Sequence, residues 1–191
     1  MKTQDKIKQY NLMLQKYIGT RSLVKVFRTV CNEDEDLSGF ILGMSKNFLF
    51  LQLYDEMTLN GYSIIKLDDF DSIRHSSYER TLRKILNAEG LLGSGYGFDK
   101  QLPLTTWPDI FNALKGYDIH VIVENINKDF LDFWIGPITR VSAKNVSIRN
   151  YNPDGVFDVK PTAIELDTIS VLKFGDRYST TFRKYLKERK K

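Results

Sequence analysis

The side chains that most often carry out chemistry are few in this sequence and lie far apart. Two histidines, His75 and His120, and one cysteine, Cys31, occur among 191 residues. Neither histidine has a second His or Cys at the spacing of a metal site, so we predict no metal ligands. Cys31 cannot form an internal disulfide and lies in a predicted strand without a basic neighbour, which is typical of a structural thiol.

The carboxylates, serines and glycines also lack the spacing that catalysis or phosphate binding requires. Adjacent strand residues such as Asp68 and Asp69 point to opposite faces and cannot act together on one substrate. The acidic run 32–36 lacks the alternating ligands and central glycine of a calcium loop. No serine lies in a nucleophile elbow, and no Gly-Lys-Ser/Thr follows the glycines of 90–97. We therefore predict no catalytic residue, no cofactor and no enzymatic activity.

The composition is that of a folded chain outside the membrane. Hydrophobic residues make up 42%, aromatic residues 13% and charged residues 27%, which is too apolar for intrinsic disorder. No apolar run approaches the roughly 20 residues that span a bilayer. Segment 1–17 is amphipathic and lacks the apolar run of a signal peptide. We expect a cytoplasmic protein without a membrane partner.

A net charge of +4 permits an anionic partner without requiring one. The basic residues are dispersed except at the end of the last predicted helix, where Lys184, Lys187, Arg189, Lys190 and Lys191 gather. Cations at that place either complement the helix dipole or bind phosphate. Both interpretations are open from the sequence.

The chain contains an internal repeat. Segment 78–86 reads YERTLRKIL and segment 178–186 reads YSTTFRKYL, so that Tyr, Thr, Arg, Lys and Leu coincide in register. Three upstream pairs follow in the same order: Asp71-Ser72-Ile73 with Asp167-Thr168-Ile169, Lys46-Asn47 with Lys144-Asn145, and Gly39 with Gly136. We infer two copies of one unit, at 1–88 and 105–191, joined by a glycine-rich linker at 89–104.

Both copies have the same predicted elements. An amphipathic helix opens each, with one apolar face formed by Ile7, Tyr10, Leu14 and Tyr17 in the first copy and by Ile110, Phe111 and Leu114 in the second. Runs of β-branched and aromatic residues then predict strands, at 23–30, 38–45, 48–55 and 62–74 in the first copy and at 120–126, 132–142, 146–151 and 157–174 in the second.

The repeated tyrosine motif predicts a closing helix in each copy. Its apolar positions in the first copy recur at helical spacing and are expected to pack on the strands; they are Tyr78, Leu82, Ile85 and Leu86. Arg83 and Lys84 are expected to lie in solvent. A motif that repeats in this way indicates a structural role in both copies.

A helix followed by short strands, with a glycine where the second strand bends, resembles the Sm and Sm-like (Hfq-like) proteins. The segments that carry the resemblance are GFILGMSKN at 39–47 and GPITRVSAKN at 136–145. It implies a mainly β chain of two tandem, five-stranded antiparallel barrels, each with an N-terminal and a C-terminal helix. It also implies single-stranded RNA as a partner, with Asn47 and Asn145 holding uracil. We add the cations Lys46, Lys144, Lys187, Arg189 and Lys190 as candidate RNA contacts.

The alternative is a protein–protein adaptor or antagonist that binds no nucleic acid. Acidic residues stand before the last predicted strand of each copy, where a phosphate-binding protein would carry cations; they are Asp68, Asp69, Asp71, Glu165 and Asp167. Under this hypothesis these acidic residues and the tyrosines of the closing helices contact a protein partner. The sequence leaves both functions open.

Overall fold

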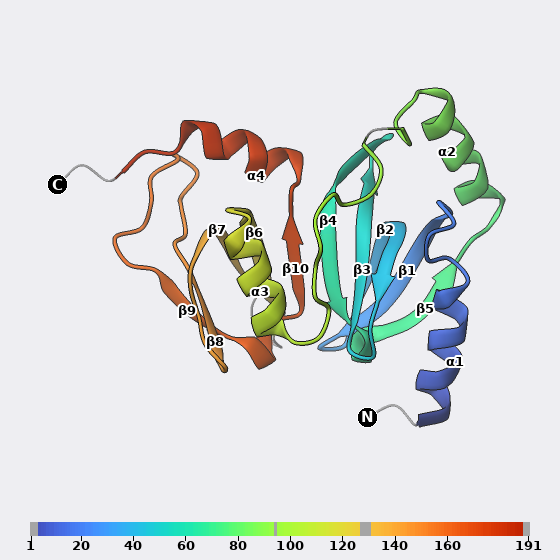
Figure 1. Cartoon of the computed structure of the whole chain (residues 1–191), viewed down its shortest axis with the longest axis horizontal. Coiled ribbons are helices and arrows are strands. Elements are labelled where there is room, and N and C mark those ends of the chain that lie inside the picture. The colour runs from blue at the N-terminus through green and yellow to red at the C-terminus, as the bar shows by residue number, and fades with distance from the viewer. Residues whose placement is uncertain (1–3, 94, 127–130, 189–191) are drawn as a thin grey trace. The chain divides into compact units, whose positions relative to one another are not determined.

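The computed structural model describes residues 4–93, 95–126 and 131–188. The chain divides into two compact units, Met1–Lys100 and Gln101–Lys191, which we call unit 1 and unit 2. Figure 1 colours the chain from blue at its start to red at its end. The predicted linker 89–104 is thus shared between the units, and most of it belongs to unit 1.

Unit 1 begins and ends with a helix and carries its strands between them. Its elements are α1 (Gln4–Gln15), β1 (Leu23–Val30), β2 (Glu33–Met44), β3 (Phe48–Asp55), β4 (Thr58–Lys66), the 3-10 turn η1 (Leu67–Asp69), β5 (Phe70–Arg74) and α2 (Ser77–Ala88). The strands are antiparallel in the order β5-β1-β2-β3-β4. Helix α1 lies against β5, and α2 lies against β1.

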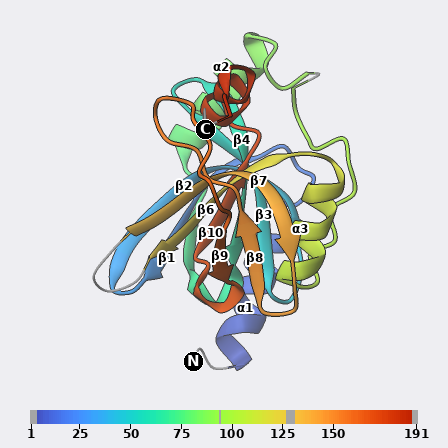
Figure 2. The same ribbon diagram turned by 90° about the vertical axis from the view of Figure 1, so that its left-hand side faces the viewer.

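Unit 2 repeats this order with shorter strands (Figure 2). Its elements are α3 (Trp107–Gly116), β6 (His120–Ile126), β7 (Leu131–Val141), β8 (Asn145–Ile148), β9 (Thr162–Glu165), η2 (Leu166–Thr168), β10 (Val171–Phe174), α4 (Arg177–Phe182) and η3 (Arg183–Tyr185). The strand order is β10-β6-β7-β8-β9. Helix α3 lies against β7, and α4 lies against β6.

The prediction of two Sm-like five-stranded barrels is wrong. The ten strands form open antiparallel sheet, with β5 and β4 at opposite ends of the strand order in unit 1 and β10 and β9 at opposite ends in unit 2. Within the described residues, no ladder joins either pair of end strands. Closure of a sheet into a barrel requires strongly tilted strands with a staggered register, and in unit 2 the strands β8, β9 and β10 have only four residues each over which to form one.

The glycine-rich segment of unit 1 is bound to the sheet. Gln52 is buried in β3, and its amide donates to the Gly95 carbonyl at 2.7 Å and accepts from the Gly97 N–H at 2.9 Å. The Tyr62 hydroxyl donates to the Gly97 carbonyl at 2.7 Å. The ring of Phe98 packs edge-on against Tyr62, with centroids 5.0 Å apart. A buried amide needs such partners, so this segment completes the hydrogen bonding of β3.

A glycine in the second strand of each unit permits a close backbone approach. Gly39 lies opposite Val24, and Gly136 lies opposite Val121. A Cβ on Gly39 would stand 2.3 Å from the Gln52 carbonyl oxygen, and a Cβ on Gly136 would stand 2.1 Å from the carbonyl oxygen of Arg149. Gly136 also has φ +155°, which L side chains rarely adopt. The repeated glycines are therefore required by the fold.

Replacing either glycine with alanine should destabilise the protein strongly. In Gly39→Ala and Gly136→Ala the new methyl group would collide with backbone, which cannot rotate away, and we expect a loss of more than about 2 kcal/mol in the free energy of unfolding. Urea denaturation measures it. Gly116→Ala is the matched control, because no atom lies within 4 Å of the added Cβ; it should be neutral or gain up to about 1 kcal/mol. Equal effects in all three variants would contradict the argument.

Candidate functional site

The loop between β2 and β3 carries the predicted RNA contacts of unit 1. Lys46 and Asn47 are exposed there. The backbone N–H of Leu67, the first residue of η1, donates to the Asn47 carbonyl at 2.8 Å. The loop is therefore held beside η1, which contributes the carboxylates of Asp68 and Asp69. Acidic residues therefore stand beside this loop, and it is not a purely cationic surface.

The same loop in unit 2 shows that the two predicted asparagines are not equivalent. There the corresponding backbone hydrogen bond ends on the carbonyl of Lys144, donated by Leu166 at 2.9 Å. Lys144 is thus the counterpart of Asn47, and Asn145 is the counterpart of the buried Phe48. The sequence pairing of Lys46-Asn47 with Lys144-Asn145 is one residue out of register.

The sequence match of the acidic segments 71–73 and 167–169 is also out of register. The turn η1 reads LDD and η2 reads LDT, and each is followed by the last strand of its unit. The counterpart of Asp68 is therefore Asp167, and the match of 71–73 with 167–169 is wrong. Asn145 pairs across the ladder with Glu165, so in unit 2 the predicted contact again lies beside a carboxylate.

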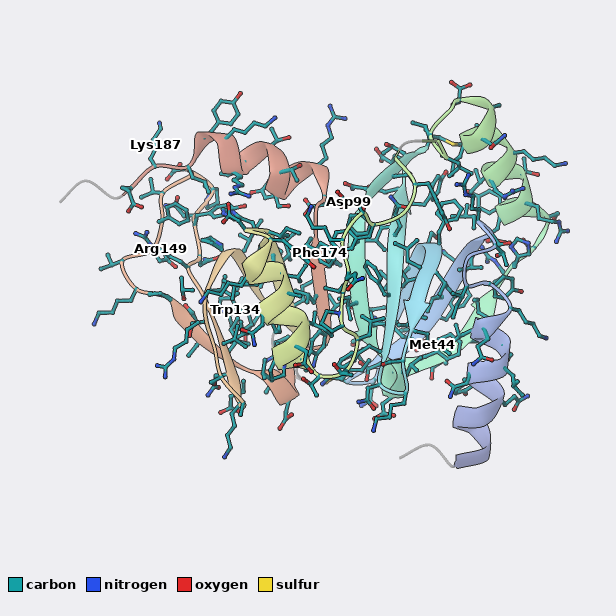
Figure 3. All side chains as sticks on the ribbon, in the orientation of Figure 1. Met44, Asp99, Trp134, Arg149, Phe174 and Lys187 are labelled. Carbon is teal, nitrogen blue, oxygen red and sulfur yellow. The ribbon has the colours of Figure 1, made fainter. Side chains whose placement is uncertain are left out.

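The C-terminal cations are held by the loop that follows β8. The Lys187 N–H donates to the Gly155 carbonyl at 2.7 Å, and its carbonyl accepts from Phe157 at 3.2 Å. Next to it, Arg149 binds both carboxylate oxygens of Glu188, at 3.0 and 2.7 Å. Figure 3 shows the Lys187 side chain directed away from the ribbon. Arg189 and Lys190 lie outside the described residues.

The arginine of the repeated motif performs the same structural task in both units. Arg83 Nε donates to the Arg21 carbonyl at 2.8 Å, and Arg183 Nη1 donates to the Asp118 carbonyl at 2.6 Å. Arg183 also forms an ion pair with the Asp118 carboxylate. Arg21 and Asp118 have φ +52° and +55°, and each lies just before the first strand of its unit. The expectation that Arg83 is merely solvated was wrong.

The tyrosine and lysine of the motif are exposed in both units. Tyr78 is 62% exposed and Tyr178 is 52% exposed. Lys84 and Lys184 are exposed as well, and within the described residues neither forms an ion pair. The expectation that Tyr78 and Ile85 pack on the strands was wrong, whereas Leu82 and Leu86 do so, at 5% and 0% exposure.

A second tyrosine occupies an equivalent position in each unit, and its recurrence was not predicted from the sequence. Tyr54 in β3 and Tyr151 after β8 are separated by the same number of positions as Gly39 and Gly136. Burial raises the pKa of Tyr54, and Tyr78 adds to the rise. Burial likewise raises the pKa of Tyr151, with a further contribution from Tyr178. The constant separation along the chain was the signal that could have revealed this pair.

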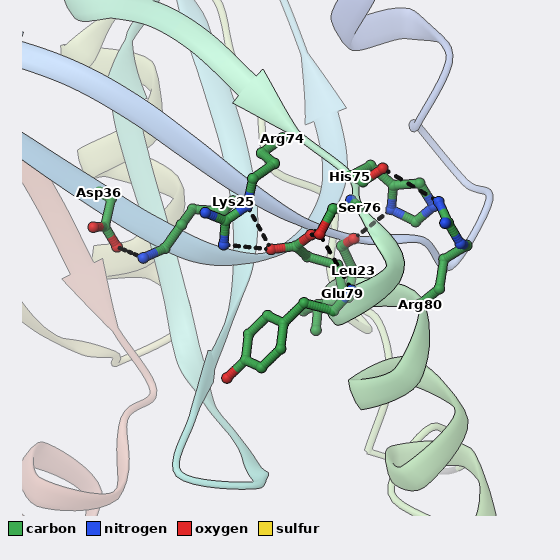
Figure 4. Close-up of polar contacts among 9 residues, drawn as sticks. Leu23, Lys25, Asp36, Arg74, His75, Ser76, Glu79 and Arg80 are labelled. Atoms are coloured by element: carbon green, nitrogen blue, oxygen red, sulfur yellow. Dashed lines mark hydrogen bonds and ion pairs between the residues drawn. The ribbon is translucent and has the colours of Figure 1, made fainter.

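A polar network fixes the start of α2 and hence the place of Tyr78 (Figure 4). Ser76 and Glu79 form a capping box, and Arg74 binds Glu79 at 2.7 and 2.9 Å. Burial alone would raise the pKa of Glu79, but the hydrogen bonds from Arg74 and Ser76 outweigh it and lower the pKa to about 2. Glu79 therefore stays ionised, and it holds α2 to the end of β5.

The two histidines and the cysteine lie where their contacts are explained by the fold. His75 Nδ1 lies 2.8 Å from the Leu23 carbonyl, and His120 is half-buried near Tyr151, with ring centroids 6.3 Å apart. Cys31 lies in the exposed turn between β1 and β2. Among the described residues, no group of three or more His, Cys, Asp or Glu side chains could hold a metal ion. No helix in that part of the chain has the length and apolarity to cross a bilayer.

Comparison with protein-family models, with curated proteins and with solved structures finds no match for this chain. In each unit the closing helix carries an exposed tyrosine and, six positions later, an exposed lysine, and a second, less exposed tyrosine precedes it in the chain. We call these groups the tyrosine faces: Tyr54, Tyr78 and Lys84 in unit 1, and Tyr151, Tyr178 and Lys184 in unit 2.

Removing the motif arginine should loosen the closing helix. In Arg83→Met or Arg183→Met, the guanidinium hydrogen bond to the turn before the first strand of the unit is lost. We expect the free energy of unfolding to fall by about 1–2 kcal/mol. Urea denaturation measures the change. Lys84→Met, one position along the same helix, is the control and should change stability by less than about 0.5 kcal/mol. A loss in the control as large as in Arg83→Met would contradict the assignment.

Unit 2 should lose stability in mild acid because of His120. Burial first, and then the positive charge of Arg183, lower the pKa of His120 to about 4, while Asp118 opposes the shift. An unfolded histidine takes up a proton near pH 6.5, so acidification from 6.5 to 4 favours unfolding, by an amount on the order of 2 kcal/mol. Thermal unfolding across this range should show a steeper fall for the natural protein than for His120→Gln. Parallel pH curves for the two would contradict the prediction.

Proposed function

We propose that this protein is a non-enzymatic binding module for single-stranded RNA, and that its two tyrosine faces make the contact. The supporting observation is the repetition of an exposed tyrosine and an exposed lysine on the closing helices of both units. The motif leucines and arginines that recur beside them are used by the fold. Tyr78 and Tyr178 keep more than half of their surface exposed, although Tyr178 also stacks on Phe182, and a ligand contact would account for their retention in both copies.

The chemistry of these faces suits a single strand. Exposed aromatic rings stack on bases of any sequence, and nearby cations bind the phosphates. Segment 177–187 carries only cationic charges, on Arg177, Arg183, Lys184 and Lys187. In α2 the single carboxylate, Glu79, is already bound by Arg74. Carboxylates lie next to these cations, because Asp176 caps α4 and Glu188 binds Arg149, so we assign the phosphate contacts to the exposed Lys84, Lys184 and Lys187. We place the protein in the cytoplasm, where such a ligand is available.

The hairpin loops are a second candidate surface for the same ligand. Lys46, Asn47, Lys144 and Asn145 stay candidate RNA contacts, as the resemblance of their segments to Sm-like proteins implies. The acidic turns beside these loops oppose phosphate binding. For this reason we assign the main contact to the helices.

A protein partner is the second candidate function, and one feature of unit 1 favours it. Met57 is 50% exposed and accepts a hydrogen bond from the Tyr54 hydroxyl at 3.3 Å. Together with the exposed Tyr78 of the same unit, they supply aromatic and thioether side chains. Tyrosine and methionine are enriched in protein interfaces. An adaptor would use this group together with the acidic turns.

Fluorescence anisotropy of a labelled single-stranded RNA should show salt-dependent binding that depends on the tyrosine faces. We expect the natural protein to bind more tightly at low than at near-physiological salt, because phosphate contacts release counterions. Tyr78→Ala combined with Tyr178→Ala should weaken binding about 10-fold or more, since each stacked base contributes about 1–3 kcal/mol. Asn47→Ala with Asn145→Ala is the matched double variant and should change affinity less than about threefold.

Each other result points to a different surface or ligand. Loss of binding in the asparagine variant, with the tyrosine variant unaffected, would move the contact to the hairpin loops. Absence of binding by the natural protein at low salt would reject RNA. A partner protein that is captured equally before and after nuclease treatment, and lost on Tyr78→Ala, would then support the adaptor.

A further inference from the structure

The tyrosine face of unit 2 contains a stack of three rings. Phe182 lies between the two tyrosines, with its centroid 5.5 Å from that of Tyr151 at an interplanar angle of 7°, and 5.1 Å from that of Tyr178 at 28°. Tyr151 is 3% exposed, whereas Tyr178 is 52% exposed. The stack therefore begins in the core and ends at the surface.

The inner end of the stack is held rigidly. Tyr151 belongs to the core with Ile122 and Ile135, and Phe157 packs edge-on against it with centroids 6.1 Å apart. Arg149 covers Phe157, with its guanidinium carbon 4.7 Å from the ring centroid, and binds Glu188. The backbone bonds of Lys187 fix the chain beyond Phe182. A ring that stacks on this base loses little conformational freedom when it binds a ligand.

The outer ring is available on one side. Phe182 covers one face of Tyr178, and half of the surface of Tyr178 is nevertheless in contact with solvent. The other face of the ring is therefore open. Lys184 and Lys187 are exposed in the chain that follows, six and nine positions after Tyr178.

Unit 1 lacks this construction. Leu82 occupies the place of Phe182 in the repeated motif and is buried. A leucine cannot extend a ring stack, so Tyr78 has no aromatic support from this position of its helix. The two tyrosine faces are thus chemically unequal although their motifs match.

We propose that Tyr178 is the open end of a preformed aromatic stack and receives a nucleobase of the single-stranded RNA, so that unit 2 supplies most of the base-stacking energy. This inference rests on the proposed function. A planar base continues the stack as a fourth ring, and its flanking phosphates meet the cations of 177–187. Purines present a larger ring face than pyrimidines, so stacking here favours adenine over uracil.

The test compares oligo-A, oligo-U and an abasic oligomer of equal length and charge, by anisotropy at fixed salt. Tyr178→Leu should weaken oligo-A binding about 10-fold or more and leave abasic binding within about twofold. Tyr178→Phe keeps the ring and should stay within about threefold of the natural protein. Tyr78→Leu should weaken oligo-A binding less than Tyr178→Leu does. Phe133→Leu removes an exposed ring of unit 2 outside the stack and is the control that should have no effect.

Two further variants exchange the stacking residue between units. Phe182→Leu should lower oligo-A affinity toward that of Tyr178→Leu, and Leu82→Phe should raise the contribution of Tyr78. Salt-dependent RNA binding that is equal for all three oligomers and unaffected by Tyr178→Leu would overturn the stack while leaving the RNA function standing. Equal weakening of oligo-A and abasic binding by Tyr178→Leu would also overturn it. If the natural protein binds none of the oligomers, both proposals fail.

Discussion

A guanidinium that binds the carbonyl of a left-handed residue holds each closing helix in place. A non-glycine residue in that conformation costs roughly 1–2 kcal/mol, and Arg21 and Asp118 both adopt it immediately before the first strand. The hydrogen bond from Arg83 or Arg183 lies at the surface and contributes about 1–2 kcal/mol, which is of a size to offset that cost. The contact connects the turn before the sheet with the helix after it. The position of the tyrosine face follows from this connection.

The same motif produces helices of different length because their ends have different partners. Helix α2 runs for 12 residues, and Leu86 accepts a backbone hydrogen bond from Leu91 beyond it. Helix α4 has 6 residues and continues as the turn η3. The chain then becomes extended, because Lys187 pairs with Val156 in a β-bridge. Tertiary pairing thus overrides a helix-compatible sequence in unit 2, and it brings Leu186 and Phe182 over Tyr151.

Some of this could be predicted from the sequence, and the failures have physical causes. Periodicity placed a helix before and after the strands of each copy. The paired glycines were expected at a bend of the second strand, and the structure shows that they permit a close approach to the neighbouring backbone. The hairpin loops were paired in the wrong register because the dipeptide Lys-Asn occurs in both. Backbone hydrogen bonds set the true register, through Asn47 in one unit and Lys144 in the other. Closure of the sheet depends on strand length, and the long loop after β8 was not evident from a run of β-forming residues.

The equivalent residues Tyr54 and Tyr151 are held by different interactions in the two units. In unit 1 the strand tyrosine donates its hydroxyl to Met57. In unit 2 the Tyr151 hydroxyl is buried and, within the described residues, has no hydrogen-bond partner, which costs about 1–3 kcal/mol. Its ring contacts with Phe157 and Phe182 contribute about 0.5–1.5 kcal/mol each and are of a size to offset that cost. Unit 2 therefore holds its tyrosine by ring packing instead of a hydrogen bond, and Phe182 is the ring that extends this packing to Tyr178 at the surface.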